Sequence, residues 1–329
     1  MKLKALLAGA VGAVLLATSA LAQGVSGTLT VYTSQPSEQM EEVVREFNKK
    51  HPGVKVEVFR SGTTEVMNKL QAEFAAGSPQ ADVLLVADAV AVTQLKNEGR
   101  LFAYTDAPVA RVPAALIDPD KTFFGTKLIT TGIIYNTNLV KTAPSSWNDL
   151  LVKDVAKSTI MPSPLYSGAA AIHVGTMVQK PDFGWKYYET LAGGGAIAGK
   201  GNGSVVDAVA KGEKAYGIII EYMALNAKTK GSPVNFVFPK EGVSVITQPV
   251  AILKTAKNLP AAKAFVDWQL SEEAQVGSVA QGYFPVTSGM KPPAGYPEPA
   301  SLKFIEGDAT RLLKEDEATK KKFADLYGG

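Results

Sequence analysis

The sequence contains no cysteine and only two histidines among its 329 residues. The absence of cysteine excludes a disulfide framework, a thiolate metal site and a cysteine nucleophile. Common enzyme motifs are also missing: there is no Gly-x-Ser-x-Gly, no His-Glu-x-x-His, no P-loop, and no Gly-x-Gly-x-x-Gly after a strand. Little therefore points to catalysis, and only a secreted hydrolase with a plain pair of carboxylates stays open.

A strong excess of charge of either sign is missing as well. Lysine and arginine number 34, aspartate and glutamate 31, which gives a formal net charge of +3. Two of the lysines, Lys2 and Lys4, lie in a segment that we expect to be removed, which leaves about one net positive charge. This balance excludes the basic surface of a typical nucleic-acid-binding protein.

The chain begins with a segment typical of export. Lys2 and Lys4 precede a run of apolar and small residues, and Ala20-Leu21-Ala22 has the small-x-small form of a cleavage site. The strongly apolar stretch is shorter than the roughly 20 residues that span a membrane, so we predict a cleaved signal peptide over residues 1–22. No cysteine follows to carry a lipid, and no other apolar run has membrane length. We expect a soluble mature protein in the periplasm.

The first half of the mature chain alternates between strand and helix patterns. Strands are predicted over residues 28–33 and 54–58, with a helix between them whose apolar residues within 40–47 follow i, i+3, i+4, i+7 spacing. A second helix is expected after residues 61–64, and residues 83–87 form an apolar run typical of a strand buried on both faces. This order predicts an open α/β sheet with its ligand site beyond the carboxyl ends of the strands.

The second half of the mature chain also alternates between strand and helix patterns, although its sequence is not a detectable repeat of the first half. Strands are expected near residues 158–161 and over 215–220, and helices after Ser167-Gly168 and after Gly203-Ser204. A mature chain of about 307 residues exceeds what one core usually organises, so two α/β lobes are predicted.

Two extended segments rich in β-branched residues, 128–136 and 243–253, lie far apart in the sequence. We predict that they are paired crossings between the lobes. The predicted first lobe comprises residues 23–127 plus 250–284, and the second comprises residues 128–249 plus 285–329.

Several segments resemble family 1 extracellular solute-binding proteins, in the branch that contains ferric-ion, hexose-phosphate and 2-aminoethylphosphonate binders. Their order and spacing follow the family over nearly the whole mature chain. They are Leu29-Thr30-Val31-Tyr32-Thr33-Ser34, Ala81-Asp82-Val83, Gly132-Ile133-Ile134-Tyr135-Asn136, Pro144-Ser145-Ser146-Trp147-Asn148-Asp149-Leu150, Ala264-Phe265-Val266-Asp267-Trp268 and Ser271-Glu272-Glu273-Ala274-Gln275. The resemblance implies a type II periplasmic binding fold, with two lobes joined by two crossing hinge strands and the ligand in the cleft between them. It also implies closure around the ligand and docking on an inner-membrane ABC permease.

Several turns with small or hydroxylic residues are candidates for holding an anion. Helix amino termini present backbone N–H groups with partial positive charge, and small residues let an oxyanion approach them. The same residue types cap ordinary helices, which is the alternative role of each turn taken alone. The candidates are Ser34, Ser61, Gly62, Thr63, Thr64, Ser167, Gly168, Ala169, Gly203 and Ser204.

Four further residues are candidates from the crossing segment and from the end of a strand. Thr130 and Thr131 are either hydroxyl donors or simply good strand formers. Glu221 and Tyr222 follow the strand predicted over residues 215–220. A carboxylate at Glu221 would suit a ligand with an anionic head and an amine or hydroxyl tail. Its alternative roles are a salt bridge or a solvated strand end.

The resemblance also allows a metal interpretation of this neighbourhood. In the ferric binders that the chain resembles, two adjacent tyrosines supply phenolates to Fe³⁺, and here the corresponding pair is Glu221-Tyr222. The family positions for a histidine and a carboxylate correspond to Ser34 or Gln35 and to Ser61. These departures favour a ligand other than iron, and Fe³⁺ with a synergistic anion, held in part by Tyr222, is the alternative.

Other residues with suitable chemistry are assigned to packing. Tyr187 and Tyr188 lie within a helical segment, where aromatic residues usually pack. His173 lies in a helix rich in alanine and valine and is expected to be either packed or on the surface, and His51 lies in a turn. We do not expect any of them to bind a metal.

The sequence thus predicts a periplasmic solute-binding component of an ABC importer that is not an enzyme. Its expected ligand is a small anionic solute, an organic phosphate or phosphonate, with a ferric ion as the alternative. No cofactor and no nucleic-acid partner are expected, and the protein is predicted to act as a monomer beside its permease.

Overall fold

The structure, a computed structural model, describes residues 24–328, so the predicted signal peptide lies outside the described residues. In this part of the chain, eleven strands form one sheet. The strands are β1 (Gly27–Thr33), β2 (Val54–Arg60), β3 (Val83–Leu85), β4 (Phe123–Asn136), β5 (Thr159–Pro162), β6 (Ile197–Gly199), β7 (Tyr216–Ile220), β8 (Val234–Val237), β9 (Val243–Ile252), β10 (Phe284–Pro285) and β11 (Phe304–Ile305).

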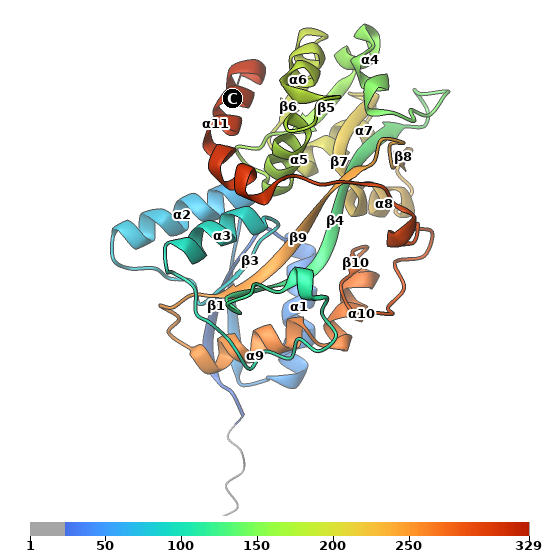
Figure 1. Ribbon diagram of the computed structural model, residues 1–329. Helices are drawn as coiled ribbons and strands as arrows, with labels where there is room; N and C mark the ends of the chain where they lie inside the picture. The colour runs from blue at the N-terminus through green and yellow to red at the C-terminus, as the bar shows by residue number, and fades with distance from the viewer. Residues whose placement is uncertain (1–23, 329) are drawn as a thin grey trace, which may run out of the picture.

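Helices cover both ends of this sheet (Figure 1). The α-helices are α1 (Ser37–Lys50), α2 (Thr63–Ala75), α3 (Ala89–Asn97), α4 (Lys153–Lys157), α5 (Gly168–Val178), α6 (Gly184–Gly193), α7 (Asn202–Ala210), α8 (Glu221–Thr229), α9 (Leu259–Gln269), α10 (Glu272–Ala280) and α11 (Ala309–Tyr327). The described part of the chain also has three short 3₁₀ helices, which span Ala114–Leu116, Trp147–Leu151 and Pro299–Ser301. No helix among residues 24–328 is both long and apolar enough to cross a membrane.

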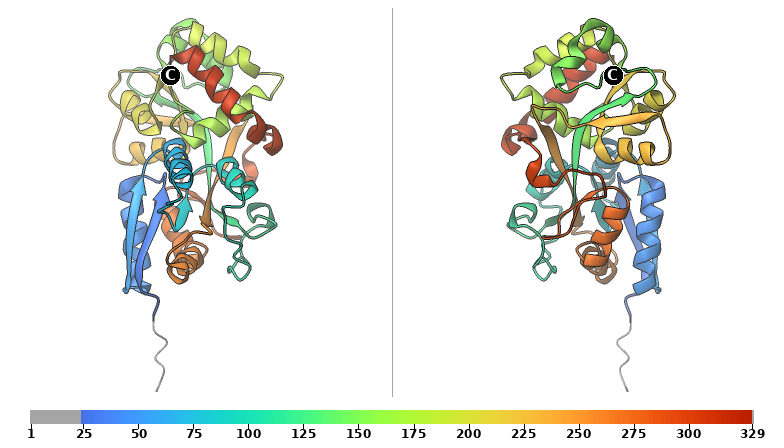
Figure 2. Two further views of the ribbon diagram at one scale, coloured as in Figure 1. Left: turned by 90° about the vertical axis from the view of Figure 1, so that its left-hand side faces the viewer. Right: turned by 90° about the vertical axis from the view of Figure 1, so that its right-hand side faces the viewer.

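The strand order, β2-β1-β3-β9-β4-β7-β5-β6, divides the sheet into two parallel units joined by an antiparallel pair. Strand β1 runs parallel to β2 and β3, and β5 runs parallel to β6 and β7. Strands β4 and β9 pair antiparallel with each other and join the two units. Figure 2 shows the two lobes one above the other, with these two strands passing between them. The predicted α/β fold with two lobes and two crossing strands is confirmed.

The first crossing strand starts at Phe123, five residues earlier than predicted. The register of β4 against β9 shifts between Gly125 and Leu128, so Thr126 and Lys127 together lie opposite the single residue Gln248. This arrangement is a β-bulge, which interrupts the alternation of apolar and polar side chains from which a strand is predicted.

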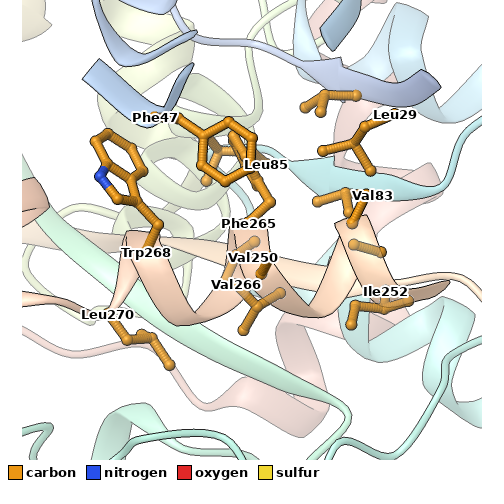
Figure 3. Packing of buried hydrophobic residues seen from close by; sticks show 14 of the residues in the cluster. Leu29, Phe47, Val83, Leu85, Val250, Ile252, Phe265, Val266, Trp268 and Leu270 are labelled. Atoms are coloured by element: carbon orange, nitrogen blue, oxygen red, sulfur yellow. The ribbon is translucent and has the colours of Figure 1, made fainter. Parts of the chain in front are cut away.

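The first lobe packs around α9, which lies against β1, β3 and β9. Phe265 and Trp268 point from α9 toward Phe47 of α1, with ring centroids 5.2 and 6.0 Å from that of Phe47 (Figure 3). Strand β3 is fully buried, as its apolar run predicts. Edge-to-face aromatic pairs of this kind add about 0.5–1.5 kcal/mol beyond the burial of their area.

The second lobe has its own core, and it includes the aromatic residues assigned to packing. Tyr187 and Tyr188 are buried there, and the Tyr187 hydroxyl donates to the backbone oxygen of Trp147 at 3.1 Å. His173 is buried beside Trp147, its Nδ1 lies 2.9 Å from Ser244 Oγ, and burial lowers its pKa to about 3. The prediction that Tyr187 and Tyr188 pack inside the protein is confirmed, and of the two alternatives left open for His173 the buried one holds.

Candidate functional site

A cavity of about 450 Å³ lies between the two lobes, at the carboxyl ends of the parallel strands. Its volume falls within the roughly 300–1,000 Å³ of small-molecule pockets. The first turns of five helices, α1, α2, α5, α7 and α8, contribute to its wall. A helix amino terminus carries partial positive charge and backbone N–H groups that lack partners within the helix. The wall is therefore suited to an anion.

Nine of the residues predicted from the sequence lie on this wall, drawn from both lobes. They are Ser34, Gly62, Thr63, Ser167, Gly168, Ala169, Gly203, Ser204 and Tyr222. The structure brings these separate turns together because the strand ends that precede them meet at one edge of each parallel unit. Their contact with a solute remains a prediction.

Two of these turns have further structural roles. Ser34 Oγ accepts a hydrogen bond from Ala87 N at 3.0 Å, and Ser167 caps α5 by accepting from Ala170 N at 3.2 Å. Helix α7 begins at Asn202 rather than after Ser204, so Gly203 and Ser204 belong to its first turn. The Asn202 side chain donates to Ser167 Oγ at 3.1 Å and ties the α5 and α7 turns together.

Five predicted residues do not lie on the wall: Ser61, Thr64, Thr130, Thr131 and Glu221. The Ser61 hydroxyl donates to Glu65 instead. Thr64 joins the lobes, because its N–H donates to Tyr166 O at 3.3 Å and its hydroxyl donates to Pro164 O at 3.1 Å. Thr130 and Thr131 are buried, and neither hydroxyl has a hydrogen-bond partner within residues 24–328.

Glu221 is the first residue of α8 and is fully buried. Its Oε2 accepts from Thr130 N at 2.6 Å, whereas Oε1 has no partner in the described part of the chain. Burial raises the pKa of this carboxyl to about 8, so it is mostly protonated at neutral pH. The alternatives of a salt bridge and a solvated strand end are both wrong, because α8 turns the side chain inward beneath the wall.

Two charged side chains of residues 24–328 line the cavity, Arg60 and Lys200, and neither was predicted from the sequence. Arg60 ends β2, and its guanidinium donates to Gln35 O at 3.1 Å, to the Tyr166 hydroxyl at 3.2 Å and to Ser34 O at 3.4 Å. The Nζ of Lys200 lies 4.7 Å from the centroid of the Tyr166 ring and 3.4 Å from Glu65 Oε1. Both side chains reach the cavity from an exposed rim. Arg60 carries no signal of its own in the sequence, because a single basic residue at the end of a strand looks the same as a solvated surface charge.

Two glycines of the wall touch the opposite lobe. A Cβ on Gly62 would lie 2.3 Å from Tyr166 O, and a Cβ on Gly168 would lie 2.8 Å from Ala87 O. Neither distance leaves room for a Cβ atom. The lobes therefore meet across the cavity at positions where only glycine fits.

Both the sequence and the fold are similar to those of known proteins. The sequence profile of the family described as bacterial extracellular solute-binding protein matches residues 33–276. A curated protein of Sinorhizobium fredii, described as a probable ABC transporter periplasmic-binding protein, is 28% identical over 275 residues, which cover 80% of this chain and 75% of the relative.

Two solved structures illustrate the likeness of fold. The periplasmic binding protein AfuA from Actinobacillus pleuropneumoniae, with exogenous fructose 6-phosphate bound, has a TM-score of 0.83 at 25% identity, over 92% of this chain and 99% of AfuA. Iron-bound HitA from Pseudomonas aeruginosa has a TM-score of 0.78 at 22% identity, over 90% and 99% of the two chains. The likeness confirms the predicted binding-protein fold.

Proposed function

The chain belongs to the bacterial extracellular solute-binding protein family, and on this premise we propose that it captures a small organic phosphate or phosphonate in the periplasm for an ABC importer. The observation that carries the choice of ligand is the charge of the cavity wall. Its charged side chains are Arg60 and Lys200, and no aspartate, glutamate or histidine of residues 24–328 lines it.

This charge pattern favours an anion over a metal ion. An ion that leaves water needs compensating charge or hydrogen bonds around it. A phosphate group would find two basic side chains and the positive ends of five helices. A ferric ion would find the same groups, and they repel it.

The ferric alternative depends on tyrosines. Tyr166, Tyr222 and Tyr283 line the cavity, and phenolates are suitable ligands for a hard trivalent ion. Tyr222 and Tyr283 pack ring against ring with centroids 4.2 Å apart, and burial raises the pKa of both well above the usual value. Both phenols are therefore neutral in the empty site, which leaves a ferric ion without an anionic ligand ready to receive it.

The proposed mechanism is closure of the lobes over the solute. The solute binds first to the turns of one lobe, and rotation about β4 and β9 brings the turns of the other lobe onto it. Contacts such as those of Thr64 with Pro164 and Tyr166 then hold the closed form. The solute shifts an equilibrium between open and closed forms by its stronger binding to the closed one.

Binding of a defined set of solutes tests this proposal. The mature protein is unfolded and refolded to remove carried solute, and its thermal unfolding is followed with fructose 6-phosphate, 2-aminoethylphosphonate, inorganic phosphate and ferric citrate. A solute at about a thousand times its Kd stabilises the fold by roughly 4 kcal/mol. Stabilisation by an organic phosphate or phosphonate supports the proposal. Stabilisation by the ferric salt alone overturns it in favour of iron binding.

A further inference from the structure

A third basic side chain, that of Lys127, lies directly behind the cavity wall, and the packing of the fold does not explain it. It occupies the bulge of β4, where Thr126 and Lys127 oppose Gln248 of β9. A bulge changes the direction of the side chains it contains. Here the Thr126 hydroxyl donates to Gln248 O at 2.7 Å, and the Lys127 side chain is 1% exposed.

The surroundings of the Lys127 ammonium group contain polar partners but no counter-charge. Its Nζ donates to Gln35 Oε1 at 3.2 Å and lies 4.5 Å from the centroid of the Tyr283 ring. Burial is the sole cause of the lowered pKa of Lys127 among residues 24–328, and no charged group there offsets it. Burying an ammonium group without a counter-ion destabilises a fold by several kcal/mol, and an apolar residue of similar size would avoid this cost. The position therefore favours a role other than stability.

The partners of Lys127 are themselves part of the wall. Gln35, Gln248 and Tyr283 all line the cavity, so Lys127 is separated from the solute by one layer of side chains. Gln35 Nε2 donates to Gln281 Oε1 at 3.0 Å, which holds the Gln35 oxygen toward Lys127. At this depth a charge acts over several ångströms with little screening.

We infer that Lys127 supplies the buried positive charge that balances a doubly charged phosphate or phosphonate head, and that capture of the solute is coupled to uptake of one proton from water by this side chain. The neutral amine of the empty protein becomes an ammonium group when the anion arrives, and it releases the proton when the anion leaves. The inference rests on the proposed function, and it names the dianionic form of the solute as the one that is held.

The other ionisable groups around Lys127 do not neutralise it. Tyr283 and Tyr222 are neutral phenols, and Glu221 is buried with a raised pKa of about 8. Arg60 reaches Gln35 only through its backbone oxygen, and Glu42 lies two hydrogen bonds away from Gln35 through Gln281. Burial lowers the pKa of Lys127 to about 7, so near neutral pH the empty protein contains much of the neutral amine. An anion in the cavity favours the ammonium form, and affinity therefore falls as pH rises above 7.

Calorimetry of solute binding at pH 8, in buffers with different enthalpies of ionisation, tests the inference. The probes are fructose 6-phosphate and 2-aminoethylphosphonate, and the wild type should take up a large fraction of one proton on binding. Each unit by which binding raises the Lys127 pKa corresponds to about a tenfold change in Kd between low and high pH. Uptake below about a tenth of a proton by a wild type that binds the solute overturns the inference, whatever the variants do.

Variants distinguish proton uptake by Lys127 from proton uptake by other titrating groups. Lys127→Met should bind more weakly at pH 7 and should lose the proton uptake, whereas Lys127→Arg should retain binding at pH 9 without uptake. Lys263→Met is the matched control, because its Nζ lies 4.9 Å from the centroid of the Tyr104 ring but far from the cavity wall. Glu221→Gln should leave the uptake intact. A Lys127→Met protein with the affinity and pH profile of the wild type contradicts the inference, and a wild type that binds neither probe contradicts the proposed function instead.

Discussion

Glu221 Oε2 accepts a hydrogen bond from the backbone N–H of Thr130 at 2.6 Å, and this pair joins the first turn of α8 to the crossing strand β4 beneath the cavity wall. The carboxyl group is thus held by the hinge region instead of facing the solute. Two residues that the sequence suggested as ligands form one structural contact, and this changes what each is expected to do.

Glu221→Gln should stabilise the protein at alkaline pH. The folded-state pKa of about 8 lies above the ordinary value of 4.5, so the contribution of Glu221 to stability is complete below pH 4.5 and is lost as pH rises toward 8. Glutamine is neutral at every pH and can still accept from Thr130 N. The free energy of unfolding in urea should be higher for the variant by a few kcal/mol at pH 9 and nearly equal at pH 4.5.

Glu38→Gln, at an exposed position on α1, is the control for this change. Solute affinity should be unchanged in Glu221→Gln, because the carboxyl does not line the cavity. A selective loss of affinity for an amine-bearing solute would instead return Glu221 to the ligand site.

Gly62→Ala should prevent closure. The added methyl would lie 2.3 Å from Tyr166 O of the other lobe, whereas Gly277→Ala, on α10, meets nothing within 4 Å and is the control. The Gly62 variant should fold normally, because the φ of Gly62 is −63°, which alanine adopts readily. Small-angle scattering with solute should show compaction for the wild type and the control only. Full compaction of Gly62→Ala would mean that the lobes close in another way.

Arg60→Met should slow solute association. Arg60 lies at the exposed rim, where a charge mainly affects the association rate and its dependence on salt. We expect an association rate lower by about three- to tenfold at low salt, with the difference shrinking as ionic strength increases. Stopped-flow measurements at two salt concentrations check this, with Arg45→Met of α1 as the control. Equal rates for Arg60→Met and wild type would remove Arg60 from the site.

Thr63→Val and Thr64→Val should weaken binding for different reasons. Thr63 lies on the wall, so the loss of affinity in Thr63→Val should depend on which solute is bound. The Thr64 hydroxyl donates to Pro164 O across the lobes, and losing one hydrogen bond of about 1 kcal/mol should raise every Kd by about fivefold. Titration calorimetry with two solutes distinguishes the patterns. A solute-dependent loss in Thr64→Val would place that hydroxyl at the ligand.

The order of the elements could be predicted from the sequence, because the buried face of each helix or strand places its apolar residues at a regular spacing. Strands β1, β2 and β7 and helices α1, α2 and α5 agree with the predicted segments within a few residues. The bulge at Thr126 and Lys127 could not be predicted, since a shift of one residue moves a side chain to the opposite face without changing composition.

The site could be predicted only where small residues follow a strand. The glycine and hydroxyl turns that line the cavity were found because helix starts have recognisable residues. Arg60 and Lys200 were missed because a single basic residue at the end of a strand has the same sequence signal as a solvated surface charge. The inward direction of Glu221 depends on the angle at which α8 leaves β7, which no local pattern encodes.

The pairing of β3 with β9 constrains the order in which the chain can fold. Val83 lies opposite Ile252, so the central strands of the first lobe become neighbours only after the second-lobe segment between them in the sequence has been synthesised. Contacts between residues so distant in sequence require closure of a long loop and form slowly. A nascent chain that ends before residue 252 therefore has no complete first lobe, and we expect folding of this lobe to wait for β9.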